Sequence, residues 1–316
     1  MVRPPTHEEM LRFRSTARVA IAYYVLVICF GAVVRITGAG GGCGSDWPAC
    51  RGDVLISPES TIHTFIEYTH RITSGLSLLL GLFLFFRART LFGSKSRVTK
   101  AAIGTVAFLL AEAFIGAVIV KFELVESNDS IARAVIISLH LVNTLGLLAC
   151  ATSCAWFSTD PDRPLRKKRD RADLFVGLIL VGIIFTSMTG AITALGDTLF
   201  LPDHTHTLKQ AWADLSSAEH FLVRLRVIHP FVAAILGIAS IYFAILLSID
   251  DTLSSAAQGW ARWILILTLV QIGLGVCNIL LKAPMGLQLT HLLVADLLWI
   301  ATWLTRLELR TDANQT

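Results

Sequence analysis

Long apolar runs alternate with short polar connections along the whole chain. A helix needs roughly 20 apolar residues to cross the hydrocarbon core of a bilayer. Runs of about this length occupy residues 19–36, 63–86, 101–121, 134–157, 174–194, 220–247, 261–281 and 285–305. The pattern therefore predicts an all-α integral membrane protein with eight transmembrane helices.

The composition points to the same class of protein. Of the 316 residues, 54% are apolar and only 16% are charged, and the mean hydropathy is +0.66. Soluble domains carry about 25% charged residues, so an ordinary soluble domain is excluded, as is a disordered chain. The net charge of +4 is too small to indicate a nucleic-acid partner, and six cysteines are too few for a disulfide scaffold.

Basic residues are concentrated in alternate connections between the predicted helices. Connections that stay in the cytoplasm are rich in Lys and Arg. The richest are the N-terminal tail and the second and fourth connections, which hold Arg3, Arg12, Arg14 and Arg18; Arg87, Arg89, Lys95, Arg97 and Lys100; and Arg163, Arg166, Lys167, Lys168, Arg169 and Arg171. Both termini are therefore expected in the cytoplasm.

The start of the chain lacks a signal-peptide pattern, so the first helix is expected to remain in the mature protein. The tail before it is short and contains Glu8 and Glu9, which do not suit an organelle presequence. We therefore expect a multi-pass protein of a bacterial plasma membrane, and favour the mitochondrial inner membrane less.

The two halves of the chain resemble each other. When each residue is compared with the one 159 positions later, Gly31 aligns with Gly190, His70 with His229, Glu112 with Gln271, and Gly116 with Gly275. A comparison at 151 positions aligns His140 with His291. The repeat predicts two pseudosymmetric four-helix bundles of the same orientation. Residues 1–157 form the first half, 158–173 a basic cytoplasmic linker, and 174–316 the second half.

Four histidines fall inside the predicted spans, at similar distances from the outer ends of alternate helices: His70, His140, His229 and His291. A lone histidine there is often a hydrogen-bonded packing residue, but ionisable groups in a bilayer are costly and usually functional. Two imidazoles that face each other across a four-helix bundle can hold a haem iron. A structural zinc site needs four ligands, which two histidines per bundle do not provide. Histidines at one common depth do not form a proton path across the membrane.

Four arginines lie at or just below the outer boundary, namely Arg35, Arg71, Arg224 and Arg226. A guanidinium group suits the carboxylates of haem propionates, although arginines at this level also extend toward lipid phosphates. They are candidates for propionate binding.

Glu67 is the most informative difference between the halves, because it aligns with Arg226. It precedes His70 by three residues and so shares its helix face, one turn nearer the outside. This predicts a permanent haem in the second half and an acid, base or cation-stabilising group beside the first-half ligand. A structural pair of Glu67 with Arg35 or Arg71 is the alternative.

Several of these motifs together resemble the haem A synthase family. They are the run GAVVRITGAG from Gly31, the run CGSDWPAC from Cys43, the run IEYTHR from Ile66, and RVIHP from Arg226. The resemblance covers the whole chain. It implies oxidation of the C8 methyl group of haem O to the formyl group of haem A, through successive hydroxylations and loss of water.

The resemblance also implies roles for individual residues. The substrate haem O would lie between His70 and His140, with Glu67 as the catalytic carboxylate. The prosthetic haem B would be held by His229 and His291. The electron donor or acceptor, homo-oligomer formation and binding of a haem O synthase stay open.

Cys43 and Cys50 lie in the first external connection, in a compartment where disulfides persist, so we expect a bridge. Its role is either to hold the loop or, as the resemblance suggests, to assist haem O transfer or protect the site. Residues 195–219 contain no cysteine, unlike many bacterial relatives, so a relay between two disulfides is not expected here.

Other polar residues receive weaker interpretations. His204 and His206 are more simply solvated than metal-bound. His63 and His220 lie near the two expected entrances, and Asp296 has no assigned role.

Two other classes of protein remain as alternatives to an enzyme. A di-haem cytochrome b would carry electrons without altering a porphyrin, and a haem carrier would bind haem O unchanged.

Overall fold

The computed structural model describes residues 5–165, 171–200, 216 and 219–311. Within these residues it contains a short 3-10 helix, Ala39–Gly41, and long α-helices: α1 His7–Ile36, α2 Ile62–Phe92, α3 Arg97–Lys121, α4 Ile131–Phe157, α5 Arg171–Leu199, α7 Phe221–Ser248, α8 Ser255–Leu280 and α9 Met285–Leu309. Eight helices are long and apolar enough to cross a membrane. The expected all-α, eight-span class is confirmed.

Several helices extend beyond the apolar runs. The clearest case is α1, which begins at His7 rather than at residue 19. Thr6 and Glu9 form a capping box, in which each side chain accepts a hydrogen bond from the backbone of the other. Such caps satisfy the free N–H groups at a helix start, so α1 continues through a polar turn that a hydropathy pattern does not detect. Similarly, α5 begins at Arg171, inside the predicted 158–173 linker.

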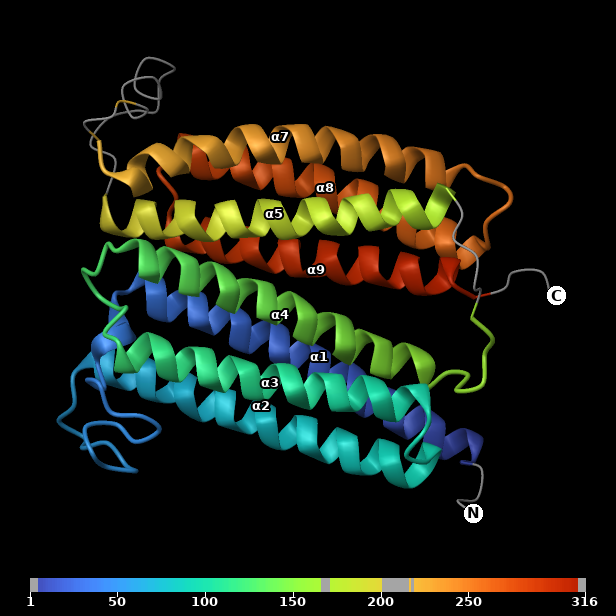
Figure 1. The fold of residues 1–316 in the computed structure, drawn as a ribbon, viewed down its shortest axis with the longest axis horizontal. Coiled ribbons are helices and arrows are strands. Elements are labelled where there is room, and N and C mark those ends of the chain that lie inside the picture. Colours follow the sequence, from blue (N-terminus) through green and yellow to red (C-terminus); the bar gives the residue numbers. More distant parts are fainter. Residues whose placement is uncertain (1–4, 166–170, 201–215, 217–218, 312–316) are drawn as a thin grey trace.

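The helices lie in two groups of four (Figure 1). One group contains α1, α2, α3 and α4, and the other contains α5, α7, α8 and α9. The start of α1 and the end of α9 lie at the same end of the molecule. The division into two pseudosymmetric halves stays a prediction from the internal repeat, and the cytoplasmic orientation of that end stays a prediction from the basic residues.

Helix α4 packs against α5 and α9 where the two groups meet. Two indole N–H groups of α9 donate hydrogen bonds to α4. Trp299 binds the carbonyl of Leu145 at 2.7 Å, and Trp303 binds the hydroxyl of Ser153 at 2.8 Å. A buried indole N–H needs such a partner, so these bonds fix how α9 lies against α4.

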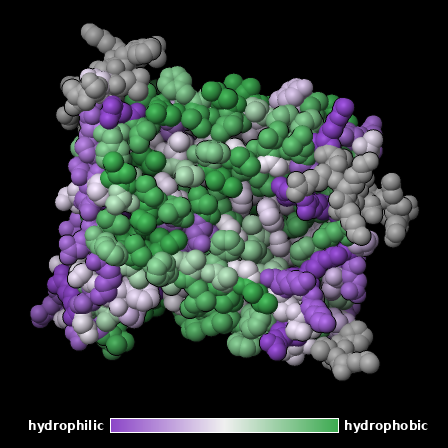
Figure 2. All heavy atoms as spheres, viewed as in Figure 1, coloured by the Kyte–Doolittle hydropathy of each residue, from purple (hydrophilic) through white to green (hydrophobic). Residues whose placement is uncertain are grey.

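Apolar side chains form a broad band across the middle of the visible face, with polar residues at both ends of the helices (Figure 2). Large apolar residues on several helices are more than half exposed, including Leu26, Phe114, Phe185, Phe231 and Ile235. In water such a surface would be unfavourable. It suits the hydrocarbon core of a bilayer, and the protein is accordingly a multi-pass membrane protein.

Candidate haem-binding sites

The four intramembrane histidines occupy matching places in their helices. His70 follows the start of α2 by eight residues, His140 follows that of α4 by nine, His229 follows that of α7 by eight, and His291 follows that of α9 by six. At 1.5 Å per residue, all four lie roughly 9–14 Å below the start of their helix. His70 and His140 lie on α2 and α4 of the first group of helices, and His229 and His291 lie on α7 and α9 of the second. Each half therefore places two histidines at a similar level.

Glycines make room for three of the four rings. A Cβ at Gly31 would lie 3.2 Å from Cε1 of His70, one at Gly190 would lie 3.1 Å from Cε1 of His229, and one at Gly275 would lie 3.4 Å from Cε1 of His291. Gly31 and Gly190 are the residues that the 159-residue offset aligns. The same close approach of helix and imidazole thus occurs in both halves.

His140 is the exception. A Cβ at Gly116 would meet nothing within 4 Å, although Gly116 aligns with Gly275. Instead, Nδ1 of His140 lies 2.5 Å from Oε2 of Glu112, which is on α3. The amide of Asn143 donates to the other carboxylate oxygen of Glu112 at 2.7 Å. The ring of His140 is therefore held by a carboxylate rather than placed against a glycine.

The residues present fit a haem in each half. An imidazole nitrogen on each side is one way to hold a haem iron, and each half provides two imidazoles at a similar level. Iron-bound histidines usually donate their second N–H to a neighbouring acceptor. His140 has Glu112 for this purpose, and Nδ1 of His229 lies 3.0 Å from the hydroxyl of Thr189. In the described part of the chain, Nδ1 of His70, His140 and His291 is buried and makes no hydrogen bond of normal geometry, although Nδ1 of His140 has the Glu112 carboxylate at 2.5 Å.

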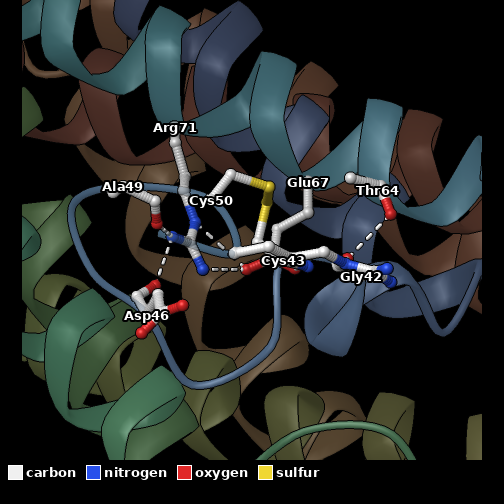
Figure 3. A network of polar contacts seen from close by, with 9 residues as sticks. Gly42, Cys43, Asp46, Ala49, Cys50, Thr64, Glu67 and Arg71 are labelled. Carbon is white, nitrogen blue, oxygen red and sulfur yellow. Dashed lines mark hydrogen bonds and ion pairs between the residues drawn. A yellow bond between two sulfur atoms is a disulfide. The ribbon is translucent and has the colours of Figure 1, made fainter. Parts of the chain in front are cut away.

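Glu67 is buried above the first pair, with 4% of its surface exposed. Its Oε2 accepts a hydrogen bond from the backbone N–H of Cys43 at 2.7 Å. Its Oε1 accepts two from Arg71, at 2.5 Å and 3.1 Å (Figure 3). An ionised carboxylate can accept all three, since it has acceptors only. The proposed pairing of Glu67 with Arg71 is thus present in the structure.

Arg71 also holds the external loop. Its Nη1 donates to the carbonyls of Asp46 and Ala49, each at 2.6 Å (Figure 3). The same loop is closed by the disulfide between Cys43 and Cys50, as predicted from the sequence. The loop, Glu67 and Arg71 consequently form one connected polar unit at the outer end of α2.

The other rim arginines have different surroundings. Arg35 leaves its own half, because its guanidinium donates to the carbonyl of Ala194 at 2.6 Å, to the hydroxyl of Thr198 at 2.8 Å and to the amide oxygen of Gln288 at 3.0 Å. It therefore joins α1 to α5 and α9, a contact that the sequence did not indicate.

Arg226 donates to the carbonyl of Phe200 at 2.9 Å and lies 3.9 Å from a carboxylate oxygen of Asp197. Nε of Arg224 is buried without a hydrogen-bond partner in the described part of the chain. Where Glu67 binds backbone and a cation in the first half, the aligned Arg226 thus binds backbone and faces a carboxylate in the second.

The remaining candidates lie outside these two sites or outside the described residues. His220 caps the start of α7 and lies 3.3 Å from Asp129, in the connection before α4. Asp296 is buried in α9, with one oxygen unpartnered in the described part of the chain. His204 and His206 lie outside the described residues. The described residues contain no group of three or more His, Cys, Asp or Glu that could hold a metal ion.

The fold and site define a class: an eight-span membrane protein with two intramembrane histidines at a similar level in each half. The comparison with protein families is more specific. Residues 15–303 match the COX15-CtaA model, described as cytochrome oxidase assembly protein. The chain belongs to this family.

Similar curated proteins carry two different names. A Thermus thermophilus protein named Protoheme IX farnesyltransferase is 39% identical over 283 residues, which cover 89% of this chain but 45% of that protein. Proteins named Heme A synthase from Staphylococcus haemolyticus and Staphylococcus aureus are 46% and 43% identical over 93 residues, with 29% of this chain and 30% of each relative covered. The chain spans less than half the length of the Thermus protein.

Proposed function

We propose that this protein is a haem A synthase, an oxidoreductase that converts the C8 methyl group of haem O into the formyl group of haem A by successive hydroxylations and loss of water. One observation carries the proposal: a buried carboxylate, Glu67, lies one turn before His70 on α2, whereas the aligned residue of the other half is an arginine, Arg226. Family membership and the Heme A synthase relatives support it.

The proposal assigns the two histidine pairs different tasks. His70 and His140 would hold the iron of the substrate haem O. His229 and His291 would hold a prosthetic haem B, which supplies one-electron transfer. Arg35, Arg71, Arg224 and Arg226 are the candidates for holding propionates at the outer rim, since guanidinium groups bind carboxylates in a two-pronged fashion.

Glu67 would act directly on the reacting methyl group. Removal of electrons from a carbon attached to an aromatic ring develops positive charge there and releases a proton. A carboxylate nearby stabilises the charge and accepts the proton. The hydrogen bonds from Cys43 and Arg71 keep Glu67 in one place, and orientation of this kind lowers the barrier further.

The test of this role is Glu67→Gln, which keeps the size and removes the base. We expect haem A formation to fall by roughly 10²–10⁴-fold, the usual contribution of a positioned acid or base. The measurement is mass analysis of haems extracted from a host that lacks haem A and expresses haem O synthase together with this chain. Glu123→Gln, a change at an exposed carboxylate, is the control and should retain the parent rate.

The Thermus relatives give a second candidate function, transfer of a farnesyl group to protohaem IX. The same host separates the two, because omission of the haem O synthase leaves only protohaem. Appearance of haem O in that strain would support the transferase. Conversion of supplied haem O to haem A would support the oxidase. Haem B bound to the purified protein with haem O unchanged would instead indicate a di-haem cytochrome b or a haem carrier.

We further propose a bacterial plasma-membrane location with cytoplasmic termini, in contact with membrane lipid.

A protohaem IX farnesyltransferase is the proposed partner. It makes the prenylated haem that this reaction consumes, and the match to less than half of the Thermus relatives supports such an association. Co-purification of a tagged haem O synthase from detergent-solubilised membranes tests it.

A further inference from the structure

His140 and His291, the proposed iron ligands on α4 and α9, have different neighbours in the two halves. In the first half, Glu112 lies 2.5 Å from Nδ1 of His140, and Asn143 donates to the same carboxylate at 2.7 Å and to the carbonyl of Phe108 at 3.0 Å. Glu112 and His140 lie on α3 and α4, and their side chains are 15% and 33% exposed. The contact is therefore largely shielded, and the attraction between a carboxylate and an imidazole N–H is stronger there than in water.

The histidine is retained in the second half, but both of its polar neighbours are replaced. Glu112 aligns with Gln271, His140 with His291, and Asn143 with Val294. In the described part of the chain, Nδ1 of His291 and the amide oxygen of Gln271 are buried without hydrogen-bond partners. The ring of His291 instead lies beside Gly275. The charged support of the ligand thus belongs to the first half alone.

His70 and His229, on α2 and α7, also differ in their neighbours, but here the second-half histidine has the polar partner. His229 has the hydroxyl of Thr189 at 3.0 Å, whereas the residue that aligns with Thr189 is Phe30, whose ring meets His70 edge-on at a centroid distance of 5.7 Å. Each half therefore places a polar side chain against one of its two imidazoles. The partner is a carboxylate in the first half and a neutral hydroxyl in the second.

We propose that Glu112, held by Asn143, is a positioning residue that presents Nε2 of His140 to the iron of the substrate haem and makes this imidazole a stronger electron donor than any ligand of the second site. A hydrogen bond from Nδ1–H to a carboxylate fixes the tautomer and the ring orientation and increases the donor strength of the other nitrogen. Hydrogen bonds to axial ligands are one means by which proteins set haem reduction potentials. The first site should therefore favour ferric iron more than the second.

This inference rests on the proposed placement of haem O in the first half, but its test needs no turnover. The protein is purified with haem B from a host that makes no haem O, and ferric haem O is then titrated in without reductant. Absorbance gives the affinity for haem O. Potentiometric titrations with and without haem O give, by difference, the reduction potential of the added haem.

Glu112→Gln places the second-half residue in the first half. We expect the affinity for haem O to fall 10–100-fold, the usual effect of removing such a partner, and its reduction potential to rise. The haem B content and potential should not change, which shows that the variant is folded. Parent affinity and parent potential in Glu112→Gln would overturn the proposal.

Two further variants keep the test decisive even if Glu112→Gln folds poorly. Asn143→Val, again the second-half residue, should shift the haem O potential in the same direction by a smaller amount. Gln271→Glu should lower the haem B potential and leave haem O binding unchanged. An unaltered haem B potential in a folded Gln271→Glu protein would count against the electronic role. If all variants behave as expected but haem O is never oxidised, the proposed function fails while the role of Glu112 stands.

Discussion

At the outer end of α2, Glu67 is bound by Arg71 and by the backbone of a disulfide-closed loop. At the aligned position of α7, Arg226 binds the carbonyl of Phe200 and faces Asp197. Both regions lie about one turn above a histidine with a neighbouring glycine. The comparison shows how a repeated scaffold can keep its ligand geometry while the charge beside the ligand is reversed, so that one half can react and the other can bind permanently.

The largest expected effect separates the two histidine pairs. His229→Ala should abolish haem B binding, because one side of the iron loses its only imidazole, whereas His70→Ala should retain haem B. The haem B content per purified protein, measured as the pyridine complex, checks this. Equal loss of haem B in both variants would contradict the assignment of haem B to the second half.

A smaller effect is expected from the glycines beside the rings. Gly190→Ala places a Cβ 3.1 Å from Cε1 of His229, so the ring must move, and we expect a several-fold lower haem B occupancy. Gly273→Ala, on α8 of the same half, meets nothing within 4 Å and is the control. The haem B content of both variants decides the point, and an equal loss in Gly273→Ala would contradict the steric explanation.

Removal of the disulfide should have a moderate effect confined to the first half. Cys43→Ser with Cys50→Ser frees the loop that supplies a backbone N–H to Glu67, and loss of a native disulfide costs about 2 kcal/mol or more. We expect several-fold slower haem A formation with unchanged haem B content. Cys277→Ser, at an exposed free cysteine, is the control. A parent rate in the double variant would show that Glu67 does not depend on the closed loop.

The smallest effect concerns the contact between the two groups of helices. Trp303→Phe removes one hydrogen bond to Ser153 and should lower the free energy of unfolding by about 1 kcal/mol. Denaturant unfolding in detergent, followed by fluorescence, measures it. Trp263→Phe, at a half-exposed tryptophan of α8, should be close to neutral. A similar loss in both variants would show that the bond between α9 and α4 has no special importance.

Much of the fold could be predicted from the sequence, because apolar length alone determines which segments can cross a bilayer. The eight spans and the place of the four histidines follow from that and from the internal repeat. Helix ends could not be predicted as well. The start of α1 depends on the capping box of Thr6 and Glu9 rather than on hydropathy.

The partners of the site residues were harder to predict. The alignment of Glu112 with Gln271 is visible in the sequence, but its contact with His140 depends on how α3 lies against α4. Likewise, Arg133 of α4 is buried and donates to the carbonyls of Glu126 and Asn128. Such contacts depend on loop paths that have no periodic signal. The difference in charge between Glu112 and the aligned Gln271 is the sequence signal that could have directed attention to Glu112.

Arg35 has a consequence for how the chain could be divided. Its three hydrogen bonds reach from α1 to α5 and α9, and the bonds of Trp299 and Trp303 to α4 add to them. The two groups of helices are thus joined by side chains as well as by the covalent connection after α4. Residues 1–165 and 171–316, expressed as separate polypeptides in one membrane, should therefore recognise each other and assemble into a working protein, and Arg35→Ala should weaken that complementation more than it affects the intact chain.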